Sequence, residues 1–273
     1  MDIRLIAFDL DGTLLDDRKK ISERTLAALK RAGEKGIILV PATGRIRGAI
    51  PKAVLELPFV HYLITLNGAV VWDLEKNTRI YQKIFQKEQS LELWDYMQPY
   101  DAMCDMYLGG QGYMEPRNLE MLDIYVLFPE MIQLVKDTRK VIPDVRDFIC
   151  RSETGVEKFN MYFVDRDLQA RVKADIKQRF PYVKATTSLV NNIELNHTEA
   201  DKGRGLTALC DYLGIRPEQA VAFGDGDNDT AMLIAAGCGV AMGNAEASVK
   251  EHADRITLTN EEDGLAAVIE EYI

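Results

Sequence analysis

Short runs of apolar residues alternate along most of the chain with amphipathic segments, and the runs end in polar residues. The clearest runs are almost continuously apolar and lie at residues 3–7, 37–40, 62–66 and 220–223. Runs of this kind are typical of strands that are buried on both faces of a parallel sheet. Between the first two runs, Ser22–Lys35 places Leu26, Leu29 and Ala32 on one helical face, and Gly36 suits the helix end. The pattern predicts an α/β fold with a Rossmann-like, doubly wound parallel sheet.

The pattern changes character between about Lys83 and about Thr187. Apolar and polar positions alternate more regularly there, and Gly109–Gly112 is typical of a hairpin loop. We expect amphipathic helices at Lys87–Met97 and Arg166–Phe180, and half-buried strands at Val145–Cys150, Val156–Val164 and Val183–Thr186. Residues 84–187 are therefore predicted to form an α+β domain that is inserted into an α/β domain made of residues 1–83 and 188–273.

The α/β pattern continues on both sides of this insertion. A helix is expected near Ile46–Leu55, and a strand at Ile193–Leu195 leads to a helix that begins near Asp201. Short strands and helices follow, and the last helix is expected from about Glu261 to Tyr272.

The candidate chemistry lies where these strands end. The first run passes into Phe8-Asp9-Leu10-Asp11-Gly12-Thr13, and residues two apart on a strand share a face, so Asp9 and Asp11 can converge on one site. The second run passes into Thr43-Gly44-Arg45, and the run at 220–223 passes into Gly224-Asp225-Gly226-Asp227-Asn228-Asp229. Ligands bind at the carboxyl ends of such strands. Carboxylates crowded there predict a site for a hard cation such as Mg²⁺.

Lys202 adds a cation at a helix start. A positive charge there opposes the helix dipole at a cost of about 0.3–1 kcal/mol, so its position indicates an anion nearby.

Composition limits the possible partners. The chain has 273 residues, 47% of them hydrophobic, which is enough for two real cores. The net charge of −10 disfavours nucleic acid and anionic membranes as partners. No run is long enough for a membrane span, and the first residues do not have the pattern of a signal peptide. The four dispersed cysteines are expected to be reduced core residues in a cytoplasmic protein. We also expect a monomer or a weak homodimer.

With these motifs in order, the whole chain resembles a haloacid dehalogenase superfamily hydrolase of the Cof type, a sugar-phosphatase-like branch with a type IIB cap. The resemblance rests on four motifs in the family's order: F-D-L-D-G-T at 8–13, A-T-G-R at 42–45, D-K-G at 201–203 and G-D-G-D-N-D at 224–229. It implies a Mg²⁺-dependent phosphatase that acts on small phosphate esters, sugar phosphates first, through an aspartyl-phosphate.

The resemblance also implies roles for residues. Asp9 would be the nucleophile and Asp11 the general acid and base. The metal would be held by Asp9, the backbone carbonyl of Asp11 and Asp225, with Asp229 either a direct or an indirect ligand. The phosphoryl oxygens would be held by Thr43, Gly44, Lys202 and Asn228.

Three further residues are weaker candidates for substrate contacts. Arg45 either binds substrate or pairs with a carboxylate, Asn67 follows a strand end, and Lys158 either binds substrate or is an exposed strand lysine.

Two other functions remain open. A phosphotransferase or phosphomutase of the same superfamily would use the same aspartyl-phosphate and pass it to a second hydroxyl. A sensor that only binds phosphometabolites would be free to lose Asp9 or Asp11, and both are present.

Overall fold

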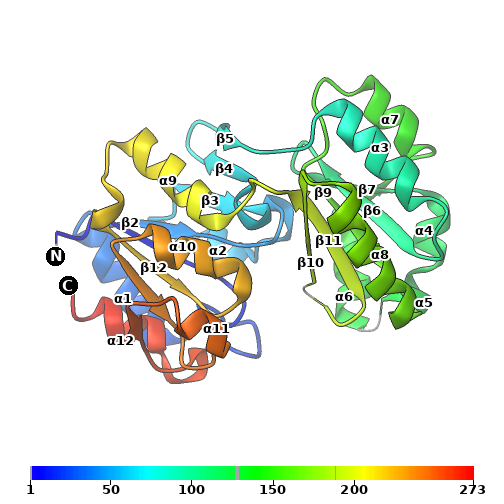
Figure 1. The fold of residues 1–273 in the computed structure, drawn as a ribbon. Coiled ribbons are helices and arrows are strands. Elements are labelled where there is room, and N and C mark those ends of the chain that lie inside the picture. The colour runs from blue at the N-terminus through cyan, green and yellow to red at the C-terminus, as the bar shows by residue number, and fades with distance from the viewer. Residues whose placement is uncertain (1, 127–128, 188) are drawn as a thin grey trace. The chain divides into compact units, whose positions relative to one another are not determined.

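The computed structural model describes residues 2–126, 129–187 and 189–273, and it divides into two compact units. The first unit contains residues 1–44, 50–82 and 201–273, and the second contains residues 45–49 and 83–200. Figure 1 shows the course of the chain through both. No helix in these described ranges combines the length and the apolar character that crossing a membrane would require.

A five-stranded parallel sheet forms the centre of the first unit. Its strand order is β14-β13-β12-β1-β2, and the strands are β1 (Leu5–Phe8), β2 (Ile38–Pro41), β12 (Ala220–Gly224), β13 (Cys238–Ala241) and β14 (Arg255–Ile256). Every residue of β1 and β12 is buried, because helices cover both faces. The prediction of a doubly wound parallel sheet is therefore confirmed.

The helices of this unit lie on the two faces of the sheet. Figure 1 shows α1 (Glu23–Glu34) and α12 (Gly264–Ile269) on one side, and α9 (Lys202–Leu213) and α10 (Thr230–Ala235) on the other. Helix α1 begins at the Ser22 N-cap, whose Oγ accepts a hydrogen bond from the backbone N–H of Thr25 at 3.0 Å. The remaining helices are α2 (Lys52–Leu55) and α11 (Ala247–Lys250).

A small antiparallel sheet extends this unit. It has the order β3-β4-β5 and contains β3 (Tyr62–Thr65), β4 (Val70–Asp73) and β5 (Thr78–Gln82). A bridge between Ala42 and Ile64 joins it to the end of β2. The short 3-10 turn η2 (Leu66–Gly68) follows β3.

The second unit has its own six-stranded sheet, with the order β10-β11-β9-β6-β7-β8. All neighbouring strands are antiparallel except β7 and β8. The strands are β6 (Met103–Leu108), β7 (Gln111–Met114), β8 (Arg139–Val141), β9 (Lys158–Tyr162), β10 (Val183–Thr186) and β11 (Asn192–His197). The expected hairpin at Gly109–Gly112 joins β6 to β7.

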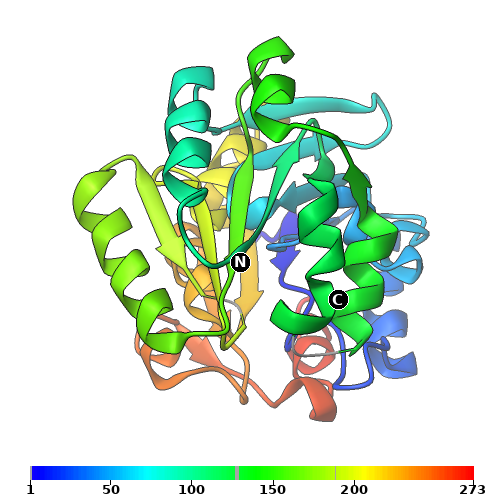
Figure 2. The same ribbon diagram turned by 90° about the vertical axis from the view of Figure 1, so that its right-hand side faces the viewer.

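The faces of this second sheet are packed differently. One face, with Phe159 and Ile193, packs in a large core with α3 (Lys87–Met97), α7 (Val145–Arg151) and α8 (Arg166–Arg179). On the other face, Met103 and Tyr162 form a smaller cluster with residues of α5 (Leu122–Tyr125) and α6 (Pro129–Thr138). Figure 2 gives a second view of the ribbon, turned by 90°, and α4 (Pro116–Glu120) is a further helix of this unit.

Several sequence-based expectations differ from the structure. Val145–Cys150 is the helix α7 and not a strand, because Asp144 caps it and the apolar residues Val145 and Ile149 lie one helical turn apart, both buried. Strand β11 pairs with β9 and β10, so residues 188–200 continue the second unit, whereas we placed the boundary near 188. Two further differences concern helices.

Both helices are shorter than predicted, because a proline interrupts one and a residue with left-handed backbone geometry interrupts the other. The helix expected at Ile46–Leu55 is divided into the 3-10 turn η1 (Arg47–Ala49) and α2, which starts after Pro51. The last helix is interrupted at Asp263, whose φ of 59° is left-handed, and the turn η5 (Asn260–Glu262) precedes it. Of the four cysteines, three are buried as expected, but Cys150 is exposed.

Candidate functional site

Three adjacent parallel strands end together and place the sequence-predicted carboxylates at one edge of the first sheet. Phe8, the last residue of β1, pairs with Pro41 on β2 and with Phe223 on β12. The backbone N–H of Asp9 then donates to the carbonyl of Phe223 at 3.1 Å. The loops after β1, β2 and β12 therefore start side by side, which is where the motifs were expected to meet.

Three carboxylates and one lysine form the centre of this edge, and all of them except Asp225 are buried. Asp9, Asp225 and Asp229 each place a carboxylate oxygen within 4.8 Å of the others. The ammonium of Lys202, which is fully buried, lies 2.7 Å from Asp9 Oδ1 and 2.5 Å from Asp229 Oδ1. The lysine therefore bridges two acids that would otherwise repel each other.

Burial and mutual repulsion raise the pKa values of these acids. Burial raises the pKa of Asp9 to about 7, and the negative charges of Asp229 and Asp225 add to the rise, although the ammonium of Lys202 opposes it. Burial, with the charge of Asp229, raises the pKa of Asp225 to about 6. Burial opposes the charge on Lys202, but the two carboxylates outweigh it and raise the pKa of the lysine. A cation bound at this site would offset the excess of negative charge.

The start of α9, where Lys202 lies, is held by a cap and by a close approach of the turn η2. Asp201 caps the helix by accepting the backbone N–H of Arg204 at 2.8 Å. Gly68 has a φ of +90°, and a Cβ at this position would lie 1.9 Å from the carbonyl oxygen of Asp201. Only glycine lets the turn η2 approach the helix start so closely.

The loop after β12 is shaped by Asp229. Its Oδ2 accepts hydrogen bonds from the backbone N–H groups of Asp225 and Gly226, both at 3.0 Å. Since Oδ1 already binds Lys202, both oxygens of Asp229 are engaged within the protein. Asp229 therefore fixes the loop and the lysine together.

Sequence reasoning missed Thr13. Its hydroxyl donates to Asp225 Oδ1 at 2.9 Å and so orients this carboxylate from the loop after β1. Thr13 is the last residue of the D-L-D-G-T motif and so could have been considered, but a threonine at this position does not indicate which side chain it contacts. The same loop passes close to Asp225 at Gly12, where a Cβ would lie 2.3 Å from Asp225 Oδ2 and φ is +82°.

A second group of predicted residues gathers around Asn67. The backbone N–H of Asn67 donates to the carbonyl of Thr43 at 3.0 Å, and its Oδ1 accepts from Asn228 Nδ2 at 3.0 Å. A Cβ on Gly44 would lie 2.8 Å from the same Oδ1. The structure therefore brings together Thr43, Gly44 and Asn228, and Asn67 connects them.

Asp11 is placed apart from the three grouped carboxylates. Its side chain is 38% exposed, and its Oδ1 lies 2.9 Å from the ammonium of Lys19, with which it forms an ion pair. The carbonyl of the next residue, Gly12, accepts a hydrogen bond from Asn244 Nδ2 at 2.8 Å. The partnership with Lys19 had no signal in the sequence, because a loop lysine eight positions away is an ordinary surface residue.

The remaining two candidates belong to the second unit. Lys158 is buried and pairs with Glu194 at 2.8 Å, so it is not the exposed strand lysine that we considered. The Arg45 guanidinium donates to the carbonyl of Ala49 at 3.0 Å.

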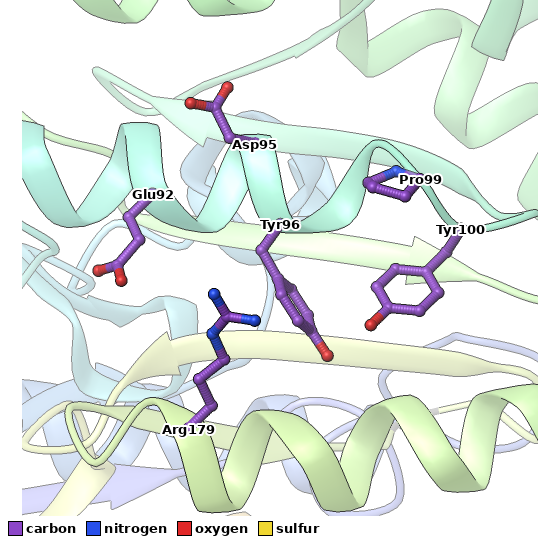
Figure 3. A pocket seen from close by; sticks show the side chains of 6 residues that line it. All are labelled: Glu92, Asp95, Tyr96, Pro99, Tyr100 and Arg179. Atoms are coloured by element: carbon purple, nitrogen blue, oxygen red, sulfur yellow. The ribbon is translucent and has the colours of Figure 1, made fainter.

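A surface pocket of ≈ 510 Å³ in the second unit contains none of the predicted catalytic, metal, phosphate or substrate residues. Figure 3 shows the residues that line it: Glu92, Asp95, Tyr96, Pro99, Tyr100 and Arg179. Its two carboxylates are already engaged, since Glu92 accepts from the hydroxyl of Tyr182 at 2.7 Å and Asp95 pairs with Arg146 at 2.8 Å. The charged centre described above remains the stronger candidate.

The chain is similar in sequence and in fold to known proteins. The sequence model of the haloacid dehalogenase-like hydrolases matches residues 6–269. A Bacillus subtilis protein named 5-amino-6-(5-phospho-D-ribitylamino)uracil phosphatase YcsE is 31% identical over 100% of this chain and 97% of its own. A haloacid dehalogenase-like hydrolase from Bacteroides thetaiotaomicron has 32% identity and a TM-score of 0.85, covering 99% of this chain and 100% of its own.

A third relative adds information on the fold alone. The subclass IIB sugar phosphatase BT4131 superposes with a TM-score of 0.80 at 23% identity, covering 98% of both chains.

Proposed function

Since the chain belongs to the haloacid dehalogenase-like hydrolase family and is a phosphatase, we propose that it hydrolyses small phosphorylated metabolites with Mg²⁺, through an aspartyl-phosphate on Asp9. The observation that carries this proposal is the close grouping of Asp9, Asp225, Asp229 and Lys202 at the strand ends.

The donor atoms fit a hard cation. Mg²⁺ prefers carboxylate and carbonyl oxygens. Asp9 Oδ2 and Asp225 Oδ2 accept no hydrogen bond from residues within the described ranges, whereas both oxygens of Asp229 are engaged. We therefore propose that Asp9, Asp225 and the carbonyl of Asp11 hold the metal and that Asp229 acts indirectly. Bound there, Mg²⁺ would neutralise charge on the phosphoryl group and the nucleophile.

Asp9 is the proposed nucleophile. Its oxygen forms a bond to phosphorus while the ester oxygen leaves, and water then attacks phosphorus and releases phosphate and free Asp9. Lys202 holds Asp9 in place by its ion pair, and its charge also attracts a phosphoryl oxygen.

Asp11 is the proposed proton donor and acceptor. It gives a proton to the departing alkoxide and later takes one from the attacking water, so one carboxyl group serves both steps. Thr43, Gly44 and Asn228, which meet around Asn67, are proposed to bind the other phosphoryl oxygens.

The substrate class follows from the relatives and from the insertion. YcsE is named for a phosphate ester of a ribityl chain, which is a sugar-like polyol. The residues of the first unit would recognise only the phosphoryl group, so we propose that the second unit acts as a cap domain and selects the leaving group. Lys158 and Arg45 remain proposed substrate residues within it.

A panel of esters tests this proposal. Purified protein with Mg²⁺ should release phosphate from hexose phosphates and from the phosphoribityl compound, and a chelator should stop the release until Mg²⁺ is restored. Phosphopeptides should be poor substrates. Release that persists after chelation, or equal activity on phosphopeptides and hexose phosphates, would contradict the proposal.

A further inference from the structure

The loop that carries Asp11 is a closed turn held at several points. Asp11 and Leu15 form an isolated bridge, and the carbonyl of Leu15 accepts Asn260 Nδ2 at 3.0 Å. The chain then reverses, because the N–H of Asp16 donates to the carbonyl of Lys20 and the N–H of Lys19 donates to the carbonyl of Asp16, both at 2.9 Å. This turn returns Lys19 to the side of Asp11.

Lys19 adopts a backbone conformation that lysine does not favour. Its φ is 60°, in the left-handed region where glycine, asparagine and aspartate are preferred. Its ammonium forms the ion pair with Asp11 at 2.9 Å, but both side chains are partly exposed, at 56% and 38%. Exposed ion pairs contribute little to stability. Stability alone therefore does not account for a lysine at this position, and an unfavourable conformation of this kind points to a role for the side chain.

We propose that Lys19 is a positioning residue for the reaction, which holds the Asp11 carboxyl group in the orientation required for proton transfer to the leaving oxygen and from water. This rests on the proposed function of Asp11. Proton transfer requires the carboxyl group within hydrogen-bond reach of the reacting oxygen, and a misplaced group loses much of its effect. The closed turn holds Lys19 in place, so the ion pair reduces the conformational freedom of the partly exposed Asp11 side chain.

Lys19→Gly separates this role from stability. Glycine removes the ammonium and also relieves the left-handed backbone, so the melting temperature should stay the same or rise. Turnover of a hexose phosphate should nevertheless fall about tenfold, because its alkoxide needs a well-placed proton donor, while an aryl phosphate should lose less than about threefold. KM should change little, since the proposed phosphoryl-binding residues are intact.

Three further variants make the comparison specific. Lys19→Arg keeps the cation and should recover most of the turnover that Lys19→Gly loses. Arg18→Ala and Lys20→Ala each remove one positive charge from the same turn, and neither side chain has a hydrogen bond or ion pair with the described part of the chain; both should behave like wild type. In an Asp11→Asn background, Lys19→Gly should cause no further loss, because its partner is already disabled.

The outcomes separate this inference from the proposed function. Equal losses on alkyl and aryl phosphates, a loss matched by the control variants, or full additivity with Asp11→Asn would overturn the role of Lys19 while the wild-type phosphatase remained active. A wild-type protein that releases phosphate from no ester in the presence of Mg²⁺ would overturn both.

Discussion

Replacing Lys202 by methionine should destabilise the protein strongly in the absence of metal. Methionine keeps most of the length of the side chain but removes the ammonium from two ion pairs, of 2.7 Å to Asp9 and 2.5 Å to Asp229. Lys202 and Asp229 are both fully buried and Asp9 is 7% exposed, so water cannot hydrate the two carboxylates in place of the ammonium.

The size of the effect follows from this burial. Removing one partner of a buried ion pair costs about 3–5 kcal/mol, because the remaining charge is left unpaired. For a unit of this size, each kcal/mol lowers the melting temperature by about 2–4 °C, so we expect a fall of roughly 6–20 °C. Mg²⁺ should restore part of the loss, and the shift that it causes should be larger in Lys202→Met than in wild type.

Thermal melts followed by circular dichroism, with chelator and with Mg²⁺, measure these shifts. Lys30→Met is a matched control, since it removes a lysine from an exposed pair with Glu34 at 3.9 Å and should change stability by less than about 1 kcal/mol. Adding Asp229→Asn to Lys202→Met should recover much of the stability by removing one unpaired charge. The reasoning is refuted if metal-free Lys202→Met melts as wild type does, or if the second substitution lowers stability further.

Three other predictions concern the acids and the loops around them. Asp11→Asn should slow hydrolysis of alkyl phosphates by about 10²-fold or more and aryl phosphates much less, as steady-state kinetics would show; equal losses would make Asp11 structural. The pKa of Asp9 is raised from 3.8 to about 7 in the folded state, so between these pH values the folded state holds a proton that the unfolded state has released. The free energy of unfolding without metal should therefore fall between about pH 4 and pH 7, by up to about 4 kcal/mol. The difference in unfolding free energy between wild type and Asp9→Asn, measured by thermal melts, isolates this contribution. Stabilisation by Mg²⁺ should grow over the same pH range, and a difference that does not change with pH would contradict the assignment. Gly68→Ala should lower the melting temperature by several degrees and reduce turnover, because its Cβ would overlap the Asp201 carbonyl at the start of α9; an unchanged melt would show that the turn can shift.

The parallel sheet of the first unit was predictable because its strands are buried on both faces and their sequences show it. Nearly continuous apolar runs at β1, β2 and β12 are followed by polar motifs, and local pattern and global fold agree there. The prediction of a strand at Val145–Cys150 was wrong, because a short segment with apolar residues at both ends fits either a strand or a helix. The Asp144 cap favours the helix. The sheet to which β11 belongs could not be predicted, since the sequence of a strand does not indicate which other strands it pairs with.

The same distinction holds for the site. Asp9, Asp225 and Lys202 could be predicted, because each is a charged residue at the end of a strand or the start of a helix, where ligands bind in this kind of fold. Thr13, which orients Asp225, and Lys19, which pairs with Asp11, depend on contacts between side chains that sequence spacing does not encode. The engagement of both Asp229 oxygens by protein donors also became visible only in the folded chain.

The central claim is that Asp9 carries the phosphoryl group, and rapid acid quenching tests it most directly. Wild-type protein mixed with Mg²⁺ and a ³²P-labelled sugar phosphate, then quenched and digested, should yield a labelled peptide that contains Asp9, with the label lost on treatment with base as expected for an acyl phosphate. Asp9→Asn should yield no labelled peptide and should lose turnover by several orders of magnitude while keeping its fold. Label on a peptide without Asp9, or turnover by Asp9→Asn within about tenfold of wild type, would contradict the account.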